Sequence, residues 1–149
     1  MANKIQIANK QVFREYEILE EFEAGIVLTG TEIKSIRQGK ASLSDSWCYF
    51  KDGELYVKGM QIAEYDRGTH YNHIPNRDRK LLLNRSELNK LDRKVKERGL
   101  TIVTIILFLN DAGLAKLKIG LARGKATHDK REDLKKKDTN REMERHFKR

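Results

Sequence analysis

The feature that most constrains the fold is the alternation of apolar and polar residues in several short segments. Between Ala115 and Leu121 every second residue is apolar, and Lys116 and Lys118 stand in the gaps. The even-numbered positions 16–28 are apolar in the same way, with Glu20 as the exception. Successive side chains of a strand point to opposite faces, so both segments are predicted to be half-buried strands. In segment 114–121 one face is core and the other is basic.

Turn sequences predict further strands. Asp52-Gly53 stands between two short alternating segments, and this dipeptide is typical of a two-residue hairpin turn. Its arms would place four residues on one apolar face: Cys48, Phe50, Leu55 and Val57. The β-branched, apolar run 101–109 is expected to be a strand, and the turn 110–113 connects it to segment 114–121.

Two helices are expected between the strands. Thr29 and Glu32 form a capping-box pattern, and Gly39 can end that helix. A second helix is predicted from about Ser86, as its N-cap, to residue 98, with Gly99 as its C-terminal cap. Residues 64–79 are polar, contain the only proline and are expected to form a long loop. Five or six antiparallel strands with two to three flanking helices predict a mainly β fold with α, a small closed antiparallel barrel of the oligonucleotide-binding type.

The positive charge is concentrated toward the end of the chain. The whole chain has 31 Lys and Arg residues against 22 Asp and Glu, a net charge of +9, and segment 124–149 has ten against six, a net of +4 in 26 residues. That segment has few large apolar residues, so it cannot offset the entropy lost on ordering. We therefore expect an RNA-binding barrel domain over 1–123 and a basic tail over 124–149, disordered when free and helical when a partner supplies the driving force.

Several classes of protein are not expected. The single cysteine, Cys48, allows no intramolecular disulfide and no four-thiolate metal site, and it is expected to be a buried core thiol. The longest apolar run has ten residues, 100–109, against about 20 for a membrane span. The N-terminus has no long apolar core of a secretory signal. A cytoplasmic protein without a membrane partner is expected.

The sequence contains no motif that predicts an enzyme. A phosphate-binding Gly-rich loop, an HExxH pair and a nucleophile-elbow serine are all missing from it. We therefore expect no catalytic residues, no cofactor and no metal. The weak alternative is a metal site, and with it a metal-dependent nuclease, built on His70 and His73 with Asp66 and Asp78 nearby.

Nucleic acid is the partner that the charge pattern favours. Loop 64–79 and segment 123–131 combine basic residues with rings that can stack on bases. Glu20, Glu21 and Glu23 form an acidic group that is either a solvated strand face or a set of acceptors for base amino groups. The alternative for the basic segments is that they only keep the chain soluble.

Four longer motifs go beyond composition. They are NK at 9–10, EEFEAGIVLTGTEIKSIRQGKASLSDS at 20–46, RKLLLNRSEL at 79–88 and IGLARGKATHDKR at 119–131. In their order and spacing they resemble the small protein B family, the transfer-messenger-RNA-binding proteins of bacterial trans-translation. The resemblance extends from Asn9 into the tail.

This resemblance implies a barrel that binds the tRNA-like domain of transfer-messenger RNA (tmRNA) and delivers that RNA to stalled ribosomes. The family's RNA contacts fall on an asparagine, an acidic residue, the central leucine of KLLL and adjoining basic residues: Asn9, Glu23, Leu82, Lys10, Arg79 and Lys80. The amide can read donors and acceptors together, the carboxylate accepts, and an exposed leucine can pack on a splayed base. Without the resemblance Leu82 would be predicted to be core.

The resemblance also gives the tail a function. In the family it enters the empty mRNA channel and the decoding centre of the small subunit, where it contacts ribosomal RNA. The implied contacts are Arg123, Gly124, Lys125, His128, Asp129, Lys130 and Arg131. Ala126 stands where a second lysine is common, so one phosphate contact is missing.

The partners implied in this way are tmRNA and the ribosome, with elongation factor Tu and alanyl-tRNA synthetase reached through the RNA. A monomer is expected. The alternative function is that of a ribosomal or general single-strand RNA-binding barrel protein.

Overall fold

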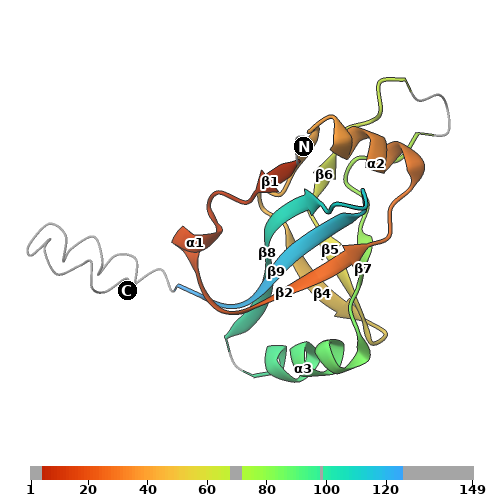
Figure 1. Cartoon of the computed structure of the whole chain (residues 1–149). Helices are drawn as coiled ribbons and strands as arrows, with labels where there is room; N and C mark the ends of the chain where they lie inside the picture. Colours follow the sequence, from red (N-terminus) through yellow and green to blue (C-terminus); the bar gives the residue numbers. More distant parts are fainter. Residues whose placement is uncertain (1–4, 68–71, 98, 126–149) are drawn as a thin grey trace, which may run out of the picture.

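The computed structural model describes residues 5–67, 72–97 and 99–125, and this part of the chain contains nine strands and three helices (Figure 1). The strands are β1 (Gln6–Ala8), β2 (Tyr16–Ile26), β3 (Ala41–Ser42), β4 (Trp47–Lys51), β5 (Glu54–Lys58), β6 (Gln61–Ile62), β7 (Arg79–Leu82), β8 (Leu100–Leu109) and β9 (Ala115–Gly124). The helices are α1 (Val12–Glu15), α2 (Gly30–Arg37) and α3 (Arg85–Val95).

Six of the strands close into a ring of antiparallel pairs. The order around the ring is β8, β4, β5, β7, β2, β9 and back to β8. β1 pairs with residues 106–108 of β8, whereas β4 pairs with residues 102 and 103 of the same strand. β3 pairs with β6 as a separate two-stranded sheet. The prediction of a mainly β fold built on a small closed antiparallel barrel is confirmed, and closure leaves few free strand edges.

The alternating segments form the long strands that the sequence predicts. In β2 Phe22 and Ala24 are buried in the main core, whereas Tyr16 and Ile18, before the register shift between Ile18 and Glu20, pack against a separate cluster that contains Val12. Glu20 is the exception in the pattern because its carboxylate reaches Lys90 of α3 at 2.7 Å. In β9 Leu117 and Ile119 are fully buried. β9 ends at Gly124, one residue past the predicted end of the barrel domain at 123.

The β4–β5 hairpin turns as predicted. Asp52 and Gly53 both have positive φ angles, 52° and 78°, which is the backbone of a type I′ turn. Cys48 pairs with Val57 across the hairpin, and both side chains are buried in the core. The buried thiol of Cys48 has a pKa raised by desolvation, which keeps it protonated and unreactive.

The helices begin at capping boxes, one of which differs from the prediction. Thr29 caps α2, and Glu32 returns its side chain to the Thr29 backbone N–H at 2.8 Å, as predicted. Asn84, not Ser86, is the N-cap of α3. The reason is that the Asn84 side chain accepts from the Glu87 N–H at 2.9 Å while Glu87 reaches back to Asn84. α3 ends at Val95, before the predicted end near residue 98.

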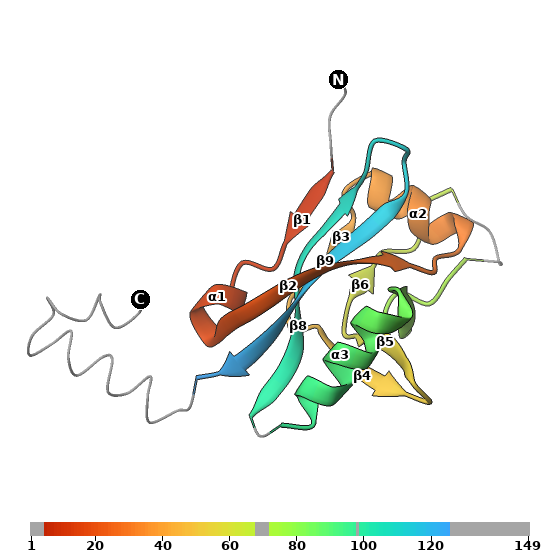
Figure 2. The ribbon, with the colours of Figure 1, turned by 60° about the horizontal axis from the view of Figure 1, so that its bottom comes forward.

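The two longer helices close the barrel at opposite ends, with α2 at the top of Figure 1 and α3 at the bottom (Figure 1). Ile36 of α2 and Leu88 and Leu91 of α3 belong to the main core. Figure 2 shows the four-residue α1 beside one end of β2, where Val12 packs in a small second cluster. No helix in the described part of the chain is long and apolar enough to cross a membrane.

Candidate nucleic-acid interface

The outer face of β2, β9 and the end of β7 brings together residues that are far apart in the sequence. Glu23 of β2 lies opposite Lys118 of β9. Gly25 of β2 lies opposite Lys116 of β9 on one side and opposite Leu82 of β7 on the other. Cross-strand partners share a face of the sheet, so an acceptor, an apolar side chain and two lysines lie on one continuous surface.

Leu82 is on the outside of the barrel. Half of its surface, 51%, is exposed, whereas its neighbour Leu81 is fully buried. In the run of three leucines, 81–83, both faces of the strand are apolar, so alternation alone cannot tell which leucine points inward. The prediction from composition that Leu82 is core is wrong, and the exposed position implied by the resemblance is the one observed.

A groove of about 400 Å³ runs beside Leu82. We call it the Leu82 groove; its lining includes Gly25, Ile33, Arg37, Leu82, Leu114 and Lys116. Gly25 has no side chain, and a Cβ there would meet the Leu82 Cβ at 3.5 Å, so glycine leaves this flank of Leu82 uncovered. The groove therefore has apolar walls with one arginine and one lysine in its lining, which suits a flat base attached to a phosphate.

The carboxylates of β2 differ in their partners. Glu21 lies 3.6 Å from the Lys118 amine, and Glu17 accepts from Arg123 at 2.9 Å. Glu20 pairs with Lys90. Within the described part of the chain, Glu23 has no ion pair or hydrogen bond to its exposed carboxylate. Of these four carboxylates, Glu23 is the one that has no basic partner among the described residues.

Asn9 is held by the barrel. Its backbone N–H donates to the Ile105 carbonyl at 2.8 Å. Its side-chain Nδ2 donates to the carbonyl and to Oγ1 of Thr104 at 3.1 and 3.2 Å, and Oγ1 of Thr104 also contacts Oγ of Ser46 at 2.6 Å. The Nδ2 group therefore holds the Asn9 amide against Thr104 of β8. The predicted role of the Asn9 amide, to read donors and acceptors together, stays a prediction.

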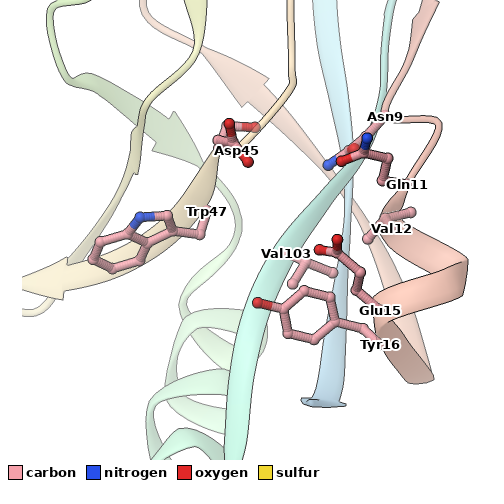
Figure 3. Close-up of a pocket in the computed structure, with 9 residues that line it drawn as sticks. Asn9, Gln11, Val12, Glu15, Tyr16, Asp45, Trp47 and Val103 are labelled. Carbon is pink, nitrogen blue, oxygen red and sulfur yellow. The ribbon is translucent and has the colours of Figure 1, made fainter. Parts of the chain in front are cut away.

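A pocket of about 220 Å³ opens beside Asn9 (Figure 3). Asp45 and Trp47 lie on one side of it, and Glu15 and Tyr16 lie opposite. Its lining contains two carboxylates, which would repel a phosphate and accept hydrogen bonds from base amino groups or ribose hydroxyls.

The three basic residues near these positions have different roles. Lys10 is exposed in the turn after Asn9. Lys80 is partly exposed, with its amine 3.9 Å from Glu54. Arg79 is fully buried, and its Nε donates to Glu32 at 2.8 Å. Arg79 as an RNA contact is therefore wrong, because a side chain with no exposed surface cannot touch RNA.

Arg79 is the centre of a buried ionic cluster that the sequence did not predict. Its guanidinium also donates to the carbonyls of Met60 and Pro75, at 2.9 and 3.0 Å, and so fixes the loop before β7. Arg77 donates to both oxygens of Glu32 at 2.8 Å. Burial raises the pKa of Glu32, but these hydrogen bonds and the charge of Arg79 outweigh burial and hold the pKa below its usual value.

The loop that precedes β7 is thus mainly structural. His73 is buried and its ring contacts Thr31 Oγ1 and the Ile62 carbonyl, both at 2.9 Å. Asp78 accepts from the Tyr49 hydroxyl at 2.5 Å, and Asp66 faces Lys40. His70 lies outside the described residues. In the part of the chain that the structure describes, no group of three or more His, Cys, Asp and Glu side chains is placed to hold a metal ion.

Some of the predicted tail contacts lie at the end of β9, and others lie outside the described residues. Arg123 and Gly124 are the last residues of β9, and Arg123 pairs with Glu17. The backbone N–H of Lys125 donates to the Glu15 carbonyl at 3.1 Å. His128, Asp129, Lys130 and Arg131, with Ala126, lie outside the described residues.

Comparison with known proteins decides the family. A sequence model described as SmpB protein matches residues 6–149. SsrA-binding proteins of Phocaeicola vulgatus and Bacteroides thetaiotaomicron are 59% and 57% identical over 145 residues, which is 97% of this chain and 97% of each relative. The chain belongs to the SmpB family. The resemblance to small protein B that its motifs carry is confirmed.

The fold of this SmpB-family chain is also found in a solved structure. That structure, described as "tmRNA-SmpB: a journey to the center of the bacterial ribosome", has a TM-score of 0.71 and 45% identity, and the match covers 92% of this chain and 96% of the other. Among the residues that the SmpB motifs single out, Glu23 and Leu82 share the outer face of β2 and β7, and Asn9 stands at the pocket beside β1. Arg37, Lys116 and Lys118 of this candidate surface were not among the predicted residues, although the alternation along β9 predicts that both lysines lie on its outer face.

Proposed function

We propose that this chain is the tmRNA-binding adaptor of trans-translation: its barrel binds the tRNA-like domain of tmRNA and delivers it to stalled ribosomes. The observation that carries the proposal is family membership over nearly the whole chain, together with an outer face of β2, β7 and β9. That face has an exposed leucine, lysines and a carboxylate that has no partner among the described residues. The adaptor has no reaction of its own and acts in the cytosol, where the ribosomes are.

The Leu82 groove is the element that recognises an unstacked nucleotide. A base that leaves the stack can lie against Leu82 and Leu114, both more than half exposed. Arg37 and Lys116, also in the groove lining, can meet the flanking phosphates. Glu23, two residues from Gly25 on the same face of β2, accepts from an exocyclic amino group, which adds base preference to a largely electrostatic contact.

Asn9 and Lys10 extend this surface across β1. The Asn9 amide oxygen accepts a ribose hydroxyl or a base N–H, and the 2′-hydroxyl is the donor that distinguishes RNA from DNA. Lys10 supplies a phosphate contact beside it. Lys80 is the other exposed cation of the predicted set and lies on the same strand as Leu82.

The second part of the proposed function belongs to the basic tail. Segment 126–149 enters the empty mRNA channel and orders there, with His128 to Arg131 in the decoding centre. A segment with ten basic and six acidic residues from 124 onward folds only when a partner offsets its ordering entropy. Tail and mRNA compete for the same volume, so ordering reports that mRNA is absent. Elongation factor Tu and alanyl-tRNA synthetase are reached through the RNA.

The decisive measurement is equilibrium binding to the tRNA-like domain of tmRNA and to an ordinary tRNA across a salt series. The adaptor prefers the tRNA-like domain by at least tenfold, about 1.4 kcal/mol, and keeps that preference as salt rises. Equal affinities that fall together with salt would contradict the proposal and indicate a general RNA-binding barrel.

A further inference from the structure

The pocket beside Asn9 (Figure 3), which we call the Asn9 pocket, is backed by a chain of three side chains from three separate segments. Asn9 follows β1, Ser46 precedes β4, and Thr104 belongs to β8. Asn9 and Ser46 line the pocket, whereas Thr104 does not line it and is fully buried. Thr104 therefore cannot touch a ligand in the pocket, and any effect it has on binding must pass through the residues that do.

The hydrogens of this chain of side chains can be assigned from chemistry. The Ser46 hydroxyl donates to the Leu43 carbonyl at 2.6 Å, because a carbonyl only accepts. A hydroxyl has one hydrogen, so Ser46 Oγ must accept from the Thr104 hydroxyl, 2.6 Å away. Oγ1 of Thr104 then accepts from Asn9 Nδ2 at 3.2 Å. Every hydrogen bond runs in one direction, from Asn9 to Leu43.

This direction fixes which way the Asn9 amide is turned. Nδ2 also donates to the Thr104 carbonyl at 3.1 Å, an atom that cannot donate in return. If the amide were rotated by half a turn, its oxygen would face that carbonyl oxygen. The Thr104 hydroxyl could not compensate, because its hydrogen is directed at Ser46. The amide nitrogen is therefore held at Thr104, and in the described part of the chain Oδ1 accepts no hydrogen bond.

The far end of the chain of side chains is a rigid anchor. The Ser46 N–H also donates to the Leu43 carbonyl, at 3.1 Å, and closes a tight turn. Asp45 in that turn has a φ of 61°, and a Cβ at Gly59 would meet the Asp45 carbonyl oxygen at 2.7 Å. Such a conformation persists where the surrounding structure fixes it. The Ser46 hydroxyl, and through it the Thr104 hydroxyl, is thus held in place.

We propose that Thr104, supported by Ser46, is the positioning residue of the Asn9 pocket: it holds the Asn9 amide so that Oδ1 is presented to the RNA as an acceptor. The inference rests on the proposed function, in which Asn9 contacts the tRNA-like domain. An acceptor that is already fixed loses little conformational entropy when the ligand binds. The group that it selects is a donor, such as a ribose hydroxyl or a base N–H.

Variants of the two hydroxyl residues test this role by binding of the tRNA-like domain. Thr104→Val removes the hydroxyl and keeps the shape of the side chain. We expect it to weaken binding by about threefold or more, because the Asn9 amide loses one of its two acceptors. Thr104→Ser keeps the hydroxyl and should restore the affinity. Ser46→Ala leaves the Thr104 hydroxyl without its acceptor and is expected to weaken binding in the same direction.

A double-mutant cycle separates positioning from a general effect on the fold. In Asn9→Ala the amide is absent, so Thr104→Val should cause no further loss of affinity. Thr101→Val is the matched control, the same substitution on β8 at a hydroxyl without a hydrogen bond in the described part of the chain. Its affinity should be unchanged. An equal loss from Thr104→Val with and without the Asn9 amide would overturn the proposal.

A second measurement needs no RNA. Hydrogen exchange of the Asn9 side-chain amide is followed by NMR in the free chain, where its two acceptors should slow exchange. We expect Thr104→Val to speed this exchange and Thr104→Ser to leave it slow. An unchanged Asn9 amide in Thr104→Val would overturn the proposal, whatever the RNA affinity.

The two measurements together distinguish this inference from the proposed function. Full affinity of Asn9→Ala for the tRNA-like domain would overturn the inference, while the proposed function would still stand on the Leu82 groove. An Asn9 amide that responds to Thr104→Val, in a chain that does not prefer the tRNA-like domain to an ordinary tRNA, would support the positioning of Asn9 and contradict the proposed function.

Discussion

At the scale of single residues, adjacent side chains on one strand have opposite functions. Leu81 is fully buried and Leu82 is 51% exposed. Leu81→Ala is expected to lower the free energy of unfolding by about 2–5 kcal/mol, because it leaves a cavity in the core. Leu82→Ala should change it by less than about 1 kcal/mol and still weaken binding of the tRNA-like domain. Urea unfolding and RNA titration of the two variants measure both effects.

The contrary result for Leu82 is easily recognised. If Leu82→Ala unfolded as readily as Leu81→Ala, the strand would pack both leucines. If it bound RNA as tightly as the unchanged chain, the Leu82 groove would not be part of the interface.

Glu23 and Glu21 lie on the same strand and carry the same charge, so substitutions of the two can be compared directly. Glu21 faces Lys118 at 3.6 Å, whereas the described part of the chain offers Glu23 no such partner. Glu23→Gln is expected to weaken binding of the tRNA-like domain several-fold, since a charged acceptor for a base amino group is lost. Glu21→Gln removes the same charge and should leave affinity unchanged or slightly higher. Equal effects of the two changes would mean that only net charge matters.

At the scale of elements, the N-cap of α3 separates two neighbouring polar residues. Asn84 accepts from the Glu87 N–H, and Ser86 only donates its hydroxyl to Asn84. Asn84→Ala is therefore expected to cost about 1 kcal/mol of stability, and Ser86→Ala only a few tenths. Thermal unfolding of the two variants checks this. A larger cost for Ser86→Ala would restore the helix start predicted from the sequence.

The Glu32 cluster makes stability depend on pH. Its hydrogen bonds and the charge of Arg79 keep the pKa of Glu32 low in the folded chain despite burial. A carboxyl group whose pKa is lower in the folded than in the unfolded chain stabilises the fold. This contribution is fully present above the pKa of the unfolded chain, about 4.3, and is lost as the pH falls through the pKa of the folded chain. We expect the free energy of unfolding to fall below about pH 4. Glu32→Gln should lower the free energy of unfolding by several kcal/mol at pH 7, because Arg79 stays buried without its charged partner. On acidification the free energy of unfolding of this variant should fall by less than that of the unchanged chain.

Urea unfolding at pH 7 and pH 3.5 tests the cluster. An acid loss of the same size in Glu32→Gln as in the unchanged chain would assign the acid sensitivity to other carboxylates.

These elements show what the sequence can and cannot predict. Strands β2 and β9 follow from alternation, because side-chain direction repeats every two residues, and the β4–β5 turn follows from Asp52-Gly53. The partner of Arg79 could not be predicted, since Glu32 lies 47 residues away and also fits a capping box. The basic residues of loop 64–79 therefore suggested RNA contacts. In the fold, Arg77 and Arg79 instead neutralise the buried carboxylate of Glu32. In the candidate site, the motifs singled out Asn9, Glu23 and Leu82, but no pattern predicts that the Asn9 amide donates to Thr104 of β8.

At the scale of the whole molecule, body and tail are expected to be separable. β9 pairs with β2 through Arg123 and Gly124, and the Lys125 N–H donates to the Glu15 carbonyl. Truncation should therefore begin at residue 126. The truncated chain is expected to keep its melting temperature and to bind the tRNA-like domain within about threefold of the full chain, because the outer face of the barrel is intact.

Rescue of stalled ribosomes should be lost in the same truncation, since nothing then fills the mRNA channel. The measurement is tagging of a nascent peptide on ribosomes stalled without a sense codon, beside RNA affinity for the same preparation. A chain whose residues 126–149 are shuffled keeps the charge and length of the tail and serves as the matched control. If shuffling restored tagging, net charge alone would suffice. If truncation abolished binding of the tRNA-like domain, the tail would belong to the RNA interface, and the division between an RNA-binding barrel and a channel-sensing tail would be wrong.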